Sequence, residues 1–442
     1  MGKCVVVIGG GFSGLSSAVK LSESGFDVIL VEKNSYLGGR AYSFVENKTG
    51  CEIDNGQHLI LGCYKNTFEF LKKINSDLKI PTKLVLPFLL NGKKYIFRTN
   101  LLPAPLNFVF GLIRFKLLSF KDKINIIKII IAIFKNEKDI GQITVSEWLT
   151  KHNQSINIQK YFWNIIAIGA LNDLPERTSA KIFKMVLKEV MFFSNKNSSF
   201  VIAEKPLSKI FSDKAEIFLK NNNCKIIINQ IVDEITQVKN SKFAIKLKNQ
   251  NKIIADAVVL ATPHDATFKF LTKLKIHNML VNKDNYEVLH SAIVNIHLWF
   301  SKSFFKEEFI AILDSPIHWI FNKSGIDRSG NFYISITISS ANEYLNMKNE
   351  NLLKMVLVEL KKSFSKFIES ELLHYKIIKE KRATMEQSNI NQQYRLSSKT
   401  KISNLFLAGD WTNTGLPATI ESAILSGFES AKLVNQFFKT GK

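Results

Sequence analysis

Residues 4–14 read Cys-Val-Val-Val-Ile-Gly-Gly-Gly-Phe-Ser-Gly, and this stretch decides the fold. The apolar, mostly β-branched residues 4–8 predict a buried parallel strand. Residues 9–14 form a G-x-G-x-x-G motif, and residues 15–24 predict a helix that ends at Gly25. A second apolar strand is expected over 27–31, and Glu32 follows it directly. This strand–helix–strand order with an acid at its end is typical of a dinucleotide-binding unit.

Each glycine of the motif has a physical role. Gly9 permits the tight turn out of the strand, Gly11 lets a pyrophosphate approach the backbone, and Gly14 lets the helix pack closely on the sheet. The anion would then lie against the free N–H groups at the positive end of the helix dipole. Glu32 would accept hydrogen bonds from ribose hydroxyls and repel a 2′-phosphate, which favours FAD or NAD over NADP.

A second glycine pair follows the acid, because residues 33–40 read Lys-Asn-Ser-Tyr-Leu-Gly-Gly-Arg. NAD dehydrogenases have no general need for this element, whereas an arginine fork suits phosphate oxygens. The sequence here resembles the FAD-dependent amine oxidase and phytoene desaturase superfamily, in which G-G-R follows the second strand. The resemblance implies that Gly39 and Arg40 contact the pyrophosphate of FAD.

A narrower resemblance comes from residues 54–64, Asp-Asn-Gly-Gln-His-Leu-Ile-Leu-Gly-Cys-Tyr. This segment is similar to that of the squalene-associated branch of the superfamily, the hydroxysqualene dehydroxylases. In the superfamily the segment runs close to the flavin ring, so the resemblance makes Gln57 and His58 candidate catalytic residues. The competing interpretation is that His58 only forms a hydrogen bond inside a loop.

The C-terminal part of the chain resembles the element that closes the FAD site in the superfamily. Residues 404–410 form a short apolar strand ending in Gly409-Asp410, and a loop and a helix to Phe438 follow. The resemblance implies that Asp410 binds the ribityl chain or a phosphate-bound water. The amides near Thr419 and Ile420, at the helix start, would stabilise negative charge near N1 and O2 of the flavin.

The predicted cofactor contacts therefore come from distant parts of the chain, and the resemblance also places the backbone of Val232 against the adenine. The full set is Gly9, Gly11, Phe12, Ser13, Gly14, Glu32, Lys33, Gly39, Arg40, Val232, Gly409, Asp410, Thr419 and Ile420. No cysteine follows Cys224, so the C-terminal cysteinyl flavin of monoamine oxidases cannot form, and we expect non-covalent FAD. The cysteines form no C-x-x-C pair or Cys/His cluster, so no metal site is expected.

These features predict an α/β protein with a Rossmann-like FAD-binding domain (a GR2-type flavoprotein fold) and an interleaved α+β substrate domain. The FAD-binding domain would comprise residues 1–80, 200–265 and 396–442, and the substrate domain residues 81–199 and 266–395. Strands over 225–228, 243–247 and 252–260 are expected to form a small meander beside FAD. Asn91-Gly92 predicts the type I′ turn of a hairpin over 88–97.

Two aromatic and apolar regions of the substrate domain allow two interpretations each. Residues 108–118 and 124–134 are strongly apolar but too short to cross a bilayer. They are expected to be core helices, with a surface that enters the membrane interface as a compatible alternative. Residues 161–163, Tyr-Phe-Trp, are either ordinary core or the lining of a hydrocarbon pocket.

Composition narrows the possible partners. The 442 residues carry a formal net charge of +22. Nucleic-acid binding is not expected, because there is neither a clustered basic patch nor a recognition motif. The positive charge is compatible with attraction to anionic lipid. A general bias in amino-acid composition, however, explains most of this charge. With no long apolar run and a strand at the N-terminus, we expect a cytoplasmic protein, in peripheral contact with the inner face of the membrane if its substrate is a lipid.

The resemblance implies a flavoenzyme of squalene or hopanoid-type isoprenoid biosynthesis. It would reductively dehydroxylate hydroxysqualene to squalene with reduced FAD as hydride donor, and it would need an electron donor that the sequence does not identify. The alternatives are a carotenoid (phytoene-type) desaturase, a flavin amine oxidase and a lipid-binding flavoprotein without turnover. The amine oxidase is disfavoured, because no aromatic cage for an amine is visible beyond Trp411.

Overall fold

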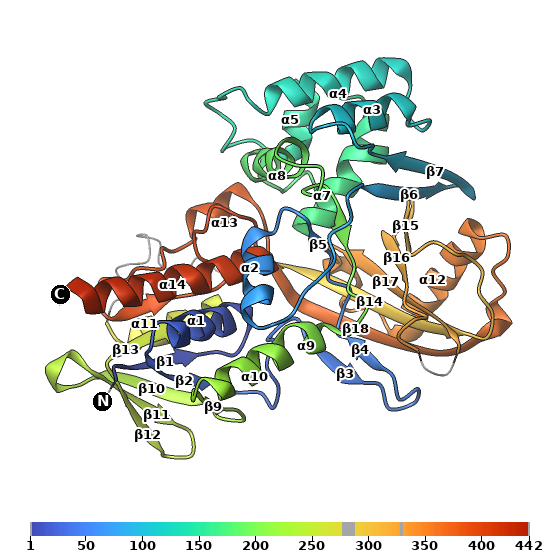
Figure 1. The fold of residues 1–442 in the computed structure, drawn as a ribbon. Helices are drawn as coiled ribbons and strands as arrows, with labels where there is room; N and C mark the ends of the chain where they lie inside the picture. Colours follow the sequence, from blue (N-terminus) through green and yellow to red (C-terminus); the bar gives the residue numbers. More distant parts are fainter. Residues whose placement is uncertain (1, 276–287, 328–329, 441–442) are drawn as a thin grey trace.

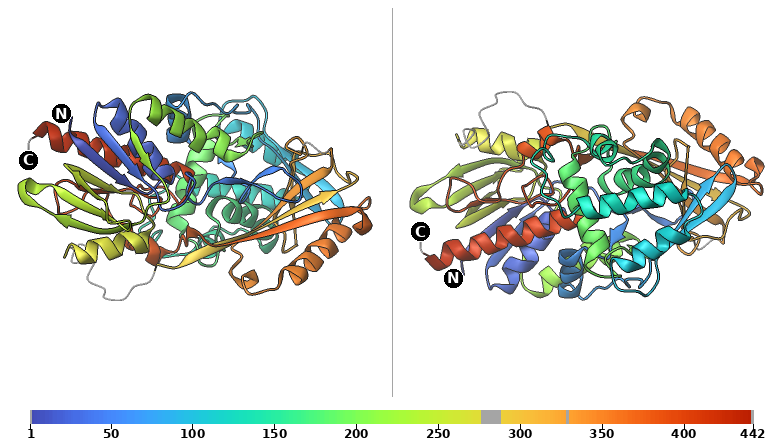
Figure 2. Two further views of the ribbon diagram at one scale, coloured as in Figure 1. Left: turned by 90° about the horizontal axis from the view of Figure 1, so that it is seen from below. Right: turned by 90° about the horizontal axis from the view of Figure 1, so that it is seen from above.

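The computed structural model describes residues 2–275, 288–327 and 330–440. Two large sheets occupy opposite ends of the molecule, and a group of helices lies above the second sheet (Figure 1 and Figure 2). The N- and C-terminal ends of the described chain lie together at the end that holds the first sheet (Figure 1).

The first sheet is parallel and five-stranded, with the order β19-β13-β1-β2-β9. Its strands are β1 (Cys4–Ile8), β2 (Asp27–Val31), β9 (Lys225–Ile227), β13 (Ala257–Leu260) and β19 (Leu405–Leu407). They come from three distant parts of the chain. Their alternating side chains are buried on both faces, as the apolar runs predict.

Helices cover one face of this sheet. They are α1 (Phe12–Glu23), α2 (Lys65–Lys73), α10 (Ser212–Asn221) and α14 (Ile420–Thr440). The axes of α1 and α14 run close together, because a Cβ at Gly427 would lie 2.2 Å from the carbonyl oxygen of Ser13. The first helix starts at Phe12 rather than at the predicted Leu15, since Gly11 already has extended N-cap geometry.

The other face packs against a small antiparallel sheet, which corrects the predicted meander. Its strands are β10 (Val232–Gln237), β11 (Phe243–Leu247) and β12 (Lys252–Ala255). The strand expected over 225–228 instead pairs with β2 in the parallel sheet. The strand expected over 252–260 is divided at Asp256, whose carboxylate accepts a hydrogen bond from the Cys4 amide at 2.9 Å. β10 escaped prediction because most of its side chains are exposed, so it lacks an apolar run.

The second sheet has seven strands in the order β18-β14-β17-β16-β15-β6-β7. Its strands are β6 (Val85–Leu90), β7 (Lys93–Arg98), β14 (His290–Phe300), β15 (Phe309–Ile312), β16 (Trp319–Asn322), β17 (Phe332–Ser339) and β18 (Leu372–Met385). α12 (Asn349–Ser363) packs on one face. Asn91 and Gly92 have φ values of 49° and 73°, which confirms the predicted hairpin turn.

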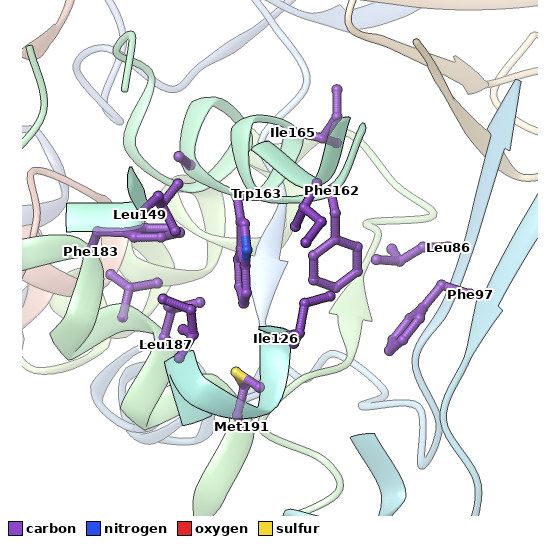
Figure 3. Close-up of a cluster of buried hydrophobic side chains, with 14 of the residues drawn as sticks. Leu86, Phe97, Ile126, Leu149, Phe162, Trp163, Ile165, Phe183, Leu187 and Met191 are labelled. Atoms are coloured by element: carbon purple, nitrogen blue, oxygen red, sulfur yellow. The ribbon is translucent and has the colours of Figure 1, made fainter. Parts of the chain in front are cut away.

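The helical group contains α3 (Leu106–Arg114), α4 (Phe120–Ala132), α5 (Val145–Lys151), α6 (Ile156–Ile158), a π-helical turn (Gln159–Trp163), α7 (Asn164–Leu171) and α8 (Ala180–Phe192). Phe162 and Trp163 lie inside it, between Phe183 and Phe97 (Figure 3). The indole N–H of Trp163 donates to Gln154 Oε1 at 2.9 Å. These two rings are therefore core, not the lining of a hydrocarbon pocket.

Short elements connect these layers: α9 (Leu207–Ile210), α11 (His264–Lys273), α13 (Asn389–Gln393), β3 (Ser43–Val45), β4 (Glu52–Asp54), β5 (Ile60–Leu61) and β8 (Phe200–Val201). The strands of the parallel and small sheets fall within the segments predicted to bind FAD, and those of the seven-stranded sheet within the substrate segments. The domain boundaries themselves stay a prediction. Within the described ranges, none of the helices has both the length and the apolar character needed to cross a bilayer.

Candidate cofactor and active site

The glycine-rich turn at the end of β1 has room for a phosphate group. Gly9 has a φ of +109°, and a Cβ there would lie 2.4 Å from the carbonyl oxygen of Ala261. A Cβ at Gly14 would lie 1.8 Å from the Gly9 carbonyl oxygen. In contrast, a Cβ at Gly11 would meet only the Cα of Gly39, at 3.8 Å, so the space in front of Gly11 is open.

The N-terminus of α1 faces this turn without a side-chain cap. Phe12 and Ser13 form its first turn and are buried, and the Phe12 ring stacks on Phe211 at 4.8 Å. Because none of the described side chains caps the helix, its first N–H groups can bind an anion. The arrangement fits the pyrophosphate of a dinucleotide.

Glu32 is buried at the end of β2, and its carboxylate holds the glycine turn in place. Oε2 accepts from the Gly10 amide at 2.6 Å, and Oε1 accepts from the Asn34 amide at 2.8 Å. Each carboxylate oxygen keeps a second lone pair, so the contacts leave room for the predicted ribose hydroxyls. The side chain of Lys33 is exposed.

Val232 lies on a segment that is hydrogen-bonded to the same residue. The Glu32 amide donates to the Ile227 carbonyl at 2.8 Å, and the Glu32 carbonyl accepts from the Gln230 amide at 3.0 Å. The start of β10 is therefore fixed beside the end of β2. This places the predicted adenine and ribose contacts on neighbouring segments.

The second glycine pair contacts the first. The Gly38 amide donates to the Gly10 carbonyl at 2.9 Å, and Gly39 has a φ of +66°. Arg40 follows, and its guanidinium donates to Asp410 Oδ1 at 2.5 Å and to the Ala383 carbonyl at 3.0 Å. Asp410 raises the pKa of Arg40. The accessible fraction of the side chain is 38% for Arg40 and 8% for Asp410, so the arginine still has surface to offer a ligand.

The turn before Asp410 requires glycine, since a Cβ at Gly409 would lie 2.3 Å from the indole nitrogen of Trp411. The loop that follows is organised by Arg395, which the sequence analysis missed. Its buried guanidinium donates to the backbone carbonyls of Asp410, at 2.7 Å, and of Leu416. An isolated arginine gave no signal, because its strongest acceptors are backbone carbonyls and the remaining ones are the uncharged side chains of Gln392, Thr414 and Ser422.

Thr419 and Ile420 lie at the start of α14, as predicted, and the Thr419 carbonyl accepts from the Ala423 amide at 3.0 Å. Glu421 is a second residue that the sequence analysis missed. Its carboxylate accepts four hydrogen bonds of 2.7–2.9 Å from the amides and side chains of Asn66 and Thr67. It therefore caps α2 and joins it to α14. The sequence feature that could have identified Glu421 is an acidic residue in the first turn of the last helix.

Gln57 and His58 follow β4 and lie over the seven-stranded sheet. The Gln57 amide donates to Asn295 Oδ1 at 3.4 Å, and a Cβ at Gly56 would lie 2.4 Å from Asn295 Nδ2. His58 Nε2 lies 3.5 Å from Asn55 Oδ1. Burial, together with the positive charges of Arg40 and Lys323, lowers the pKa of His58 to about 4. His58 is thus neutral at neutral pH, and close enough to Arg40 to sense its charge.

A comparison of whole sequences agrees with this site. The site consists of two glycine turns, an acid after β2 and a C-terminal loop that returns to them. The family model described as flavin-containing amine oxidoreductase matches residues 12–435. The chain belongs to this family. Its cofactor is FAD, and the flavoenzyme is an oxidoreductase.

Individual relatives of this flavoenzyme cover nearly its full length. A hydroxysqualene dehydroxylase of Zymomonas mobilis is 25% identical over 97% of the chain and 98% of its own length. A 15-cis-phytoene desaturase of Synechococcus elongatus is 24% identical over 97% of the chain and 95% of its own length. The solved structure of an oxidoreductase from Methanosarcina mazei superposes with a TM-score of 0.76 at 19% identity, covering 97% of this chain and all of that one.

The residues present fit FAD. The open space in front of Gly11, the uncapped N-terminus of α1 and the partly exposed Arg40 all lie on the two glycine turns, which are hydrogen-bonded to each other. Among the described residues, no group of three or more His, Cys, Asp or Glu side chains could hold a metal. The individual cofactor and catalytic contacts remain predictions, since the similarity of the whole chains does not test single residues.

Proposed function

We propose that this flavoenzyme reductively dehydroxylates hydroxysqualene to squalene. The bound reduced flavin would supply a hydride to the carbon that loses its hydroxyl, and a proton from the medium would leave with that hydroxyl as water. The full-length relative from Zymomonas mobilis, which bears the name of this activity, supports the proposal. Re-reduction of the flavin after each turnover requires an electron donor.

The observation that carries the proposal is the position of His58. It belongs to the segment that resembles the hydroxysqualene dehydroxylases, and its pKa is lowered partly by Arg40, which belongs to the cofactor motif. A neutral imidazole is not a strong acid, but it can donate one N–H hydrogen bond to the departing hydroxyl oxygen. Gln57, whose Oε1 is buried and has no hydrogen-bond partner among the described residues, would help to orient the substrate.

Three substrates separate the candidate reactions. Purified protein is incubated anaerobically with a reductant and hydroxysqualene, then in oxidised form with phytoene or with simple amines, and products and flavin spectra are followed. Squalene formed only with the first substrate supports the proposal. Turnover of phytoene or an amine, or no turnover of any of the three, would reject it.

A carotenoid-type desaturase is the second candidate, supported by the full-length relative from Synechococcus elongatus. Such an enzyme would use oxidised FAD to take a hydride from a polyene precursor. Both candidates act on isoprenoid lipids, so the substrate class is common to them. The phytoene incubation decides between them.

We also propose peripheral contact with the membrane through α3 and α4. One face of each helix packs into the core, through Phe108 and Ile126 among others, while the opposite face is exposed. The exposed apolar side chains are Leu106, Ile113, Phe120, Ile124, Ile127, Ile131 and Phe134. The cations between them are Arg114, Lys116, Lys121, Lys123, Lys128 and Lys135. An apolar surface that alternates with cations is suited to an anionic bilayer.

A further inference from the structure

One face of the seven-stranded sheet carries buried polar side chains. The face that packs on α12 is apolar and includes Ile296 of β14 and Ile336 of β17. Because successive residues of a strand point to opposite faces, their neighbours share the other face. This face carries Asn295, His297 and Trp299 of β14 and Tyr333, Ser335 and Thr337 of β17, all of them buried. Polar groups in such a position need hydrogen-bond partners.

Several polar atoms at this face have no partner. Among the described residues, four buried atoms there form no hydrogen bond: Oε1 of Gln57, Nε2 of His297, Nε1 of Trp299 and Oγ of Ser335. Gln57 lies over the face, because its amide donates to Asn295 Oδ1 at 3.4 Å. Unpartnered buried atoms of this kind are suited to a polar ligand group or to water. The face could therefore hold the hydroxyl end of a substrate.

Lys323 directly follows β16 and belongs to the same face. Its amide donates to the Tyr333 carbonyl at 2.8 Å, which continues the register of β16 and β17 and places the two residues opposite each other. Only 6% of Lys323 is exposed. Its Nζ donates to the Ala203 carbonyl at 3.2 Å, the one hydrogen bond that this atom forms within the described ranges. An ammonium group has three N–H donors, so two remain for a ligand.

The charge of Lys323 acts on both histidines of this region. Burial and nearby cations, Lys323 among them, lower the pKa of His58 to about 4 and that of His297 to about 3. Burial also lowers the pKa of Lys323 itself, although the carboxylates of Asp54 and Glu308 oppose this effect. The buried ammonium group therefore releases a proton more easily than an exposed lysine does.

The other polar groups near Gln57 are poorer proton donors. His58 and His297 are already neutral at neutral pH. Asp410 raises the pKa of Arg40, and burial raises that of Tyr333, so both groups keep their protons. A hydroxyl group leaves a carbon atom more easily when an acid protonates it.

We propose that Lys323 is the proton donor of the dehydroxylation. Its ammonium group transfers a proton to the hydroxyl oxygen as the C–O bond breaks, and the hydroxyl departs as water. The carbon receives its hydride from the reduced cofactor, and the neutral lysine then regains a proton from water. The inference rests on the proposed function, and it adds the acid that this reaction requires.

The test separates substrate binding from the chemical step. Lys323→Met removes the ammonium group and keeps most of the length of the side chain. The Kd of the oxidised holoenzyme for hydroxysqualene, followed by the flavin absorption spectrum, should equal that of the wild type. Single-turnover oxidation of the prereduced flavin by hydroxysqualene should slow by about 100-fold or more. Lys302→Met is the matched control and should keep both values, because the Lys302 side chain is 75% exposed.

The pH dependence of the wild type is a measurement that needs no variant, and it decides alone if Lys323→Met loses FAD. A proton donor acts only in its protonated form, so the single-turnover rate should decrease between pH 7 and about pH 10. The pKa values of His58 and His297 lie below this range, and that of Tyr333 lies above it. In Lys323→Met the decrease should be absent.

Lys323→Arg distinguishes proton transfer from the effect of charge, since a guanidinium group stays positive but does not release its proton. This variant should be as slow as Lys323→Met. A wild-type rate in either variant, or a wild-type enzyme whose rate does not change with pH, would overturn the role of Lys323 alone. If the wild type forms no squalene at all, the proposed function is wrong and this role fails with it.

Discussion

The guanidinium of Arg40 lies 2.5 Å from the carboxylate of Asp410, although 370 residues separate the two in the sequence. This ion pair joins the second glycine turn to the loop before α14. Because Asp410 is almost fully buried and Arg40 keeps accessible surface, the aspartate fixes the arginine for contact with a ligand. The two predicted cofactor residues therefore act as one unit.

Replacing Arg40 should weaken FAD binding and folding together. Arg40→Ala removes a charge-assisted contact to phosphate and leaves the Asp410 carboxylate buried without its cation, so FAD affinity should fall by about tenfold or more. Flavin content after gel filtration and the Kd of the apoprotein for FAD measure this. Arg382→Ala is the control, because Arg382 forms an exposed ion pair with Asp265 and should change neither quantity. Normal flavin content in Arg40→Ala would contradict the assignment.

Glu421→Ala should destabilise the protein by about 3 kcal/mol, because it leaves the capped amides of Asn66 and Thr67 without an acceptor. Urea denaturation of the holoprotein measures the free energy of unfolding. Glu350→Ala, in the exposed first turn of α12, provides the control and should cost no more than about 0.5 kcal/mol. Equal losses in the two variants would show that the cap contributes little.

Stability should decrease as the pH falls from 6.5 to about 4. Burial lowers the pKa of His58, His264 and His318 to about 4, and that of His297 to about 3. Unfolded histidines have a pKa near 6.5, so below that pH the unfolded chain binds protons that the native chain does not. Their contribution to stability is complete above pH 6.5 and decreases by up to about 1.4 kcal/mol per pH unit for each histidine.

Urea denaturation at pH 7, 6 and 5 tests this dependence. In His297→Gln the free energy of unfolding should decrease less steeply with falling pH, because the unfolded variant binds about one proton fewer. The glutamine can keep a hydrogen bond to the Tyr333 hydroxyl, which lies 2.7 Å from His297 Nδ1. A free energy of unfolding that does not change between pH 7 and 5 would rule the effect out.

His58→Ala should lower turnover of hydroxysqualene by about 100-fold while FAD content stays normal, if His58 contacts the departing hydroxyl. Single-turnover oxidation of the prereduced flavin by substrate isolates this step from re-reduction. His152→Ala serves as the control, because His152 lies at the end of α5 beside Glu137. Full turnover in His58→Ala would contradict a catalytic role and show that this histidine is only structural.

Membrane contact is tested with vesicles that contain phosphatidylglycerol. Phe120 is 79% exposed and Ile131 is 54% exposed, so Phe120→Ser with Ile131→Ser should cost little stability. Sedimentation with the vesicles should weaken by about tenfold or more, since two apolar side chains no longer enter the interface. Ile254→Ser on β12, 48% exposed in the wild type, should bind as the wild type does. Equal binding by all three proteins would exclude this face.

The cofactor side of the fold could be predicted because its signals are local. Residues 4–32 place a strand, a turn, a helix and a second strand in sequence, and each needs only its neighbours in the chain. The steric need for Gly9 and Gly14 follows from the same turn, and the structure shows the contacts that enforce it.

The remaining features depend on contacts between distant segments. β6 pairs in parallel with β15 through Phe88 and Ala311, which no local pattern indicates. The acceptors of Arg395 and the donors to Glu421 are likewise set by folding. β9 was assigned to the wrong sheet, because short apolar strands differ only in their partners. β10 was missed, because most of its side chains are exposed and it shows no apolar run.

The last strand of the parallel sheet has a consequence for biosynthesis. β19 pairs with β13 at Leu405 and Val258, and α14 covers α1. At roughly 5–20 residues per second, a ribosome needs roughly 20–80 s to reach Leu405 after it starts. From its own synthesis until then, each of α1 and β13 lacks the partner that α14 or β19 provides, so the nascent chain should depend on chaperones until its final helix emerges.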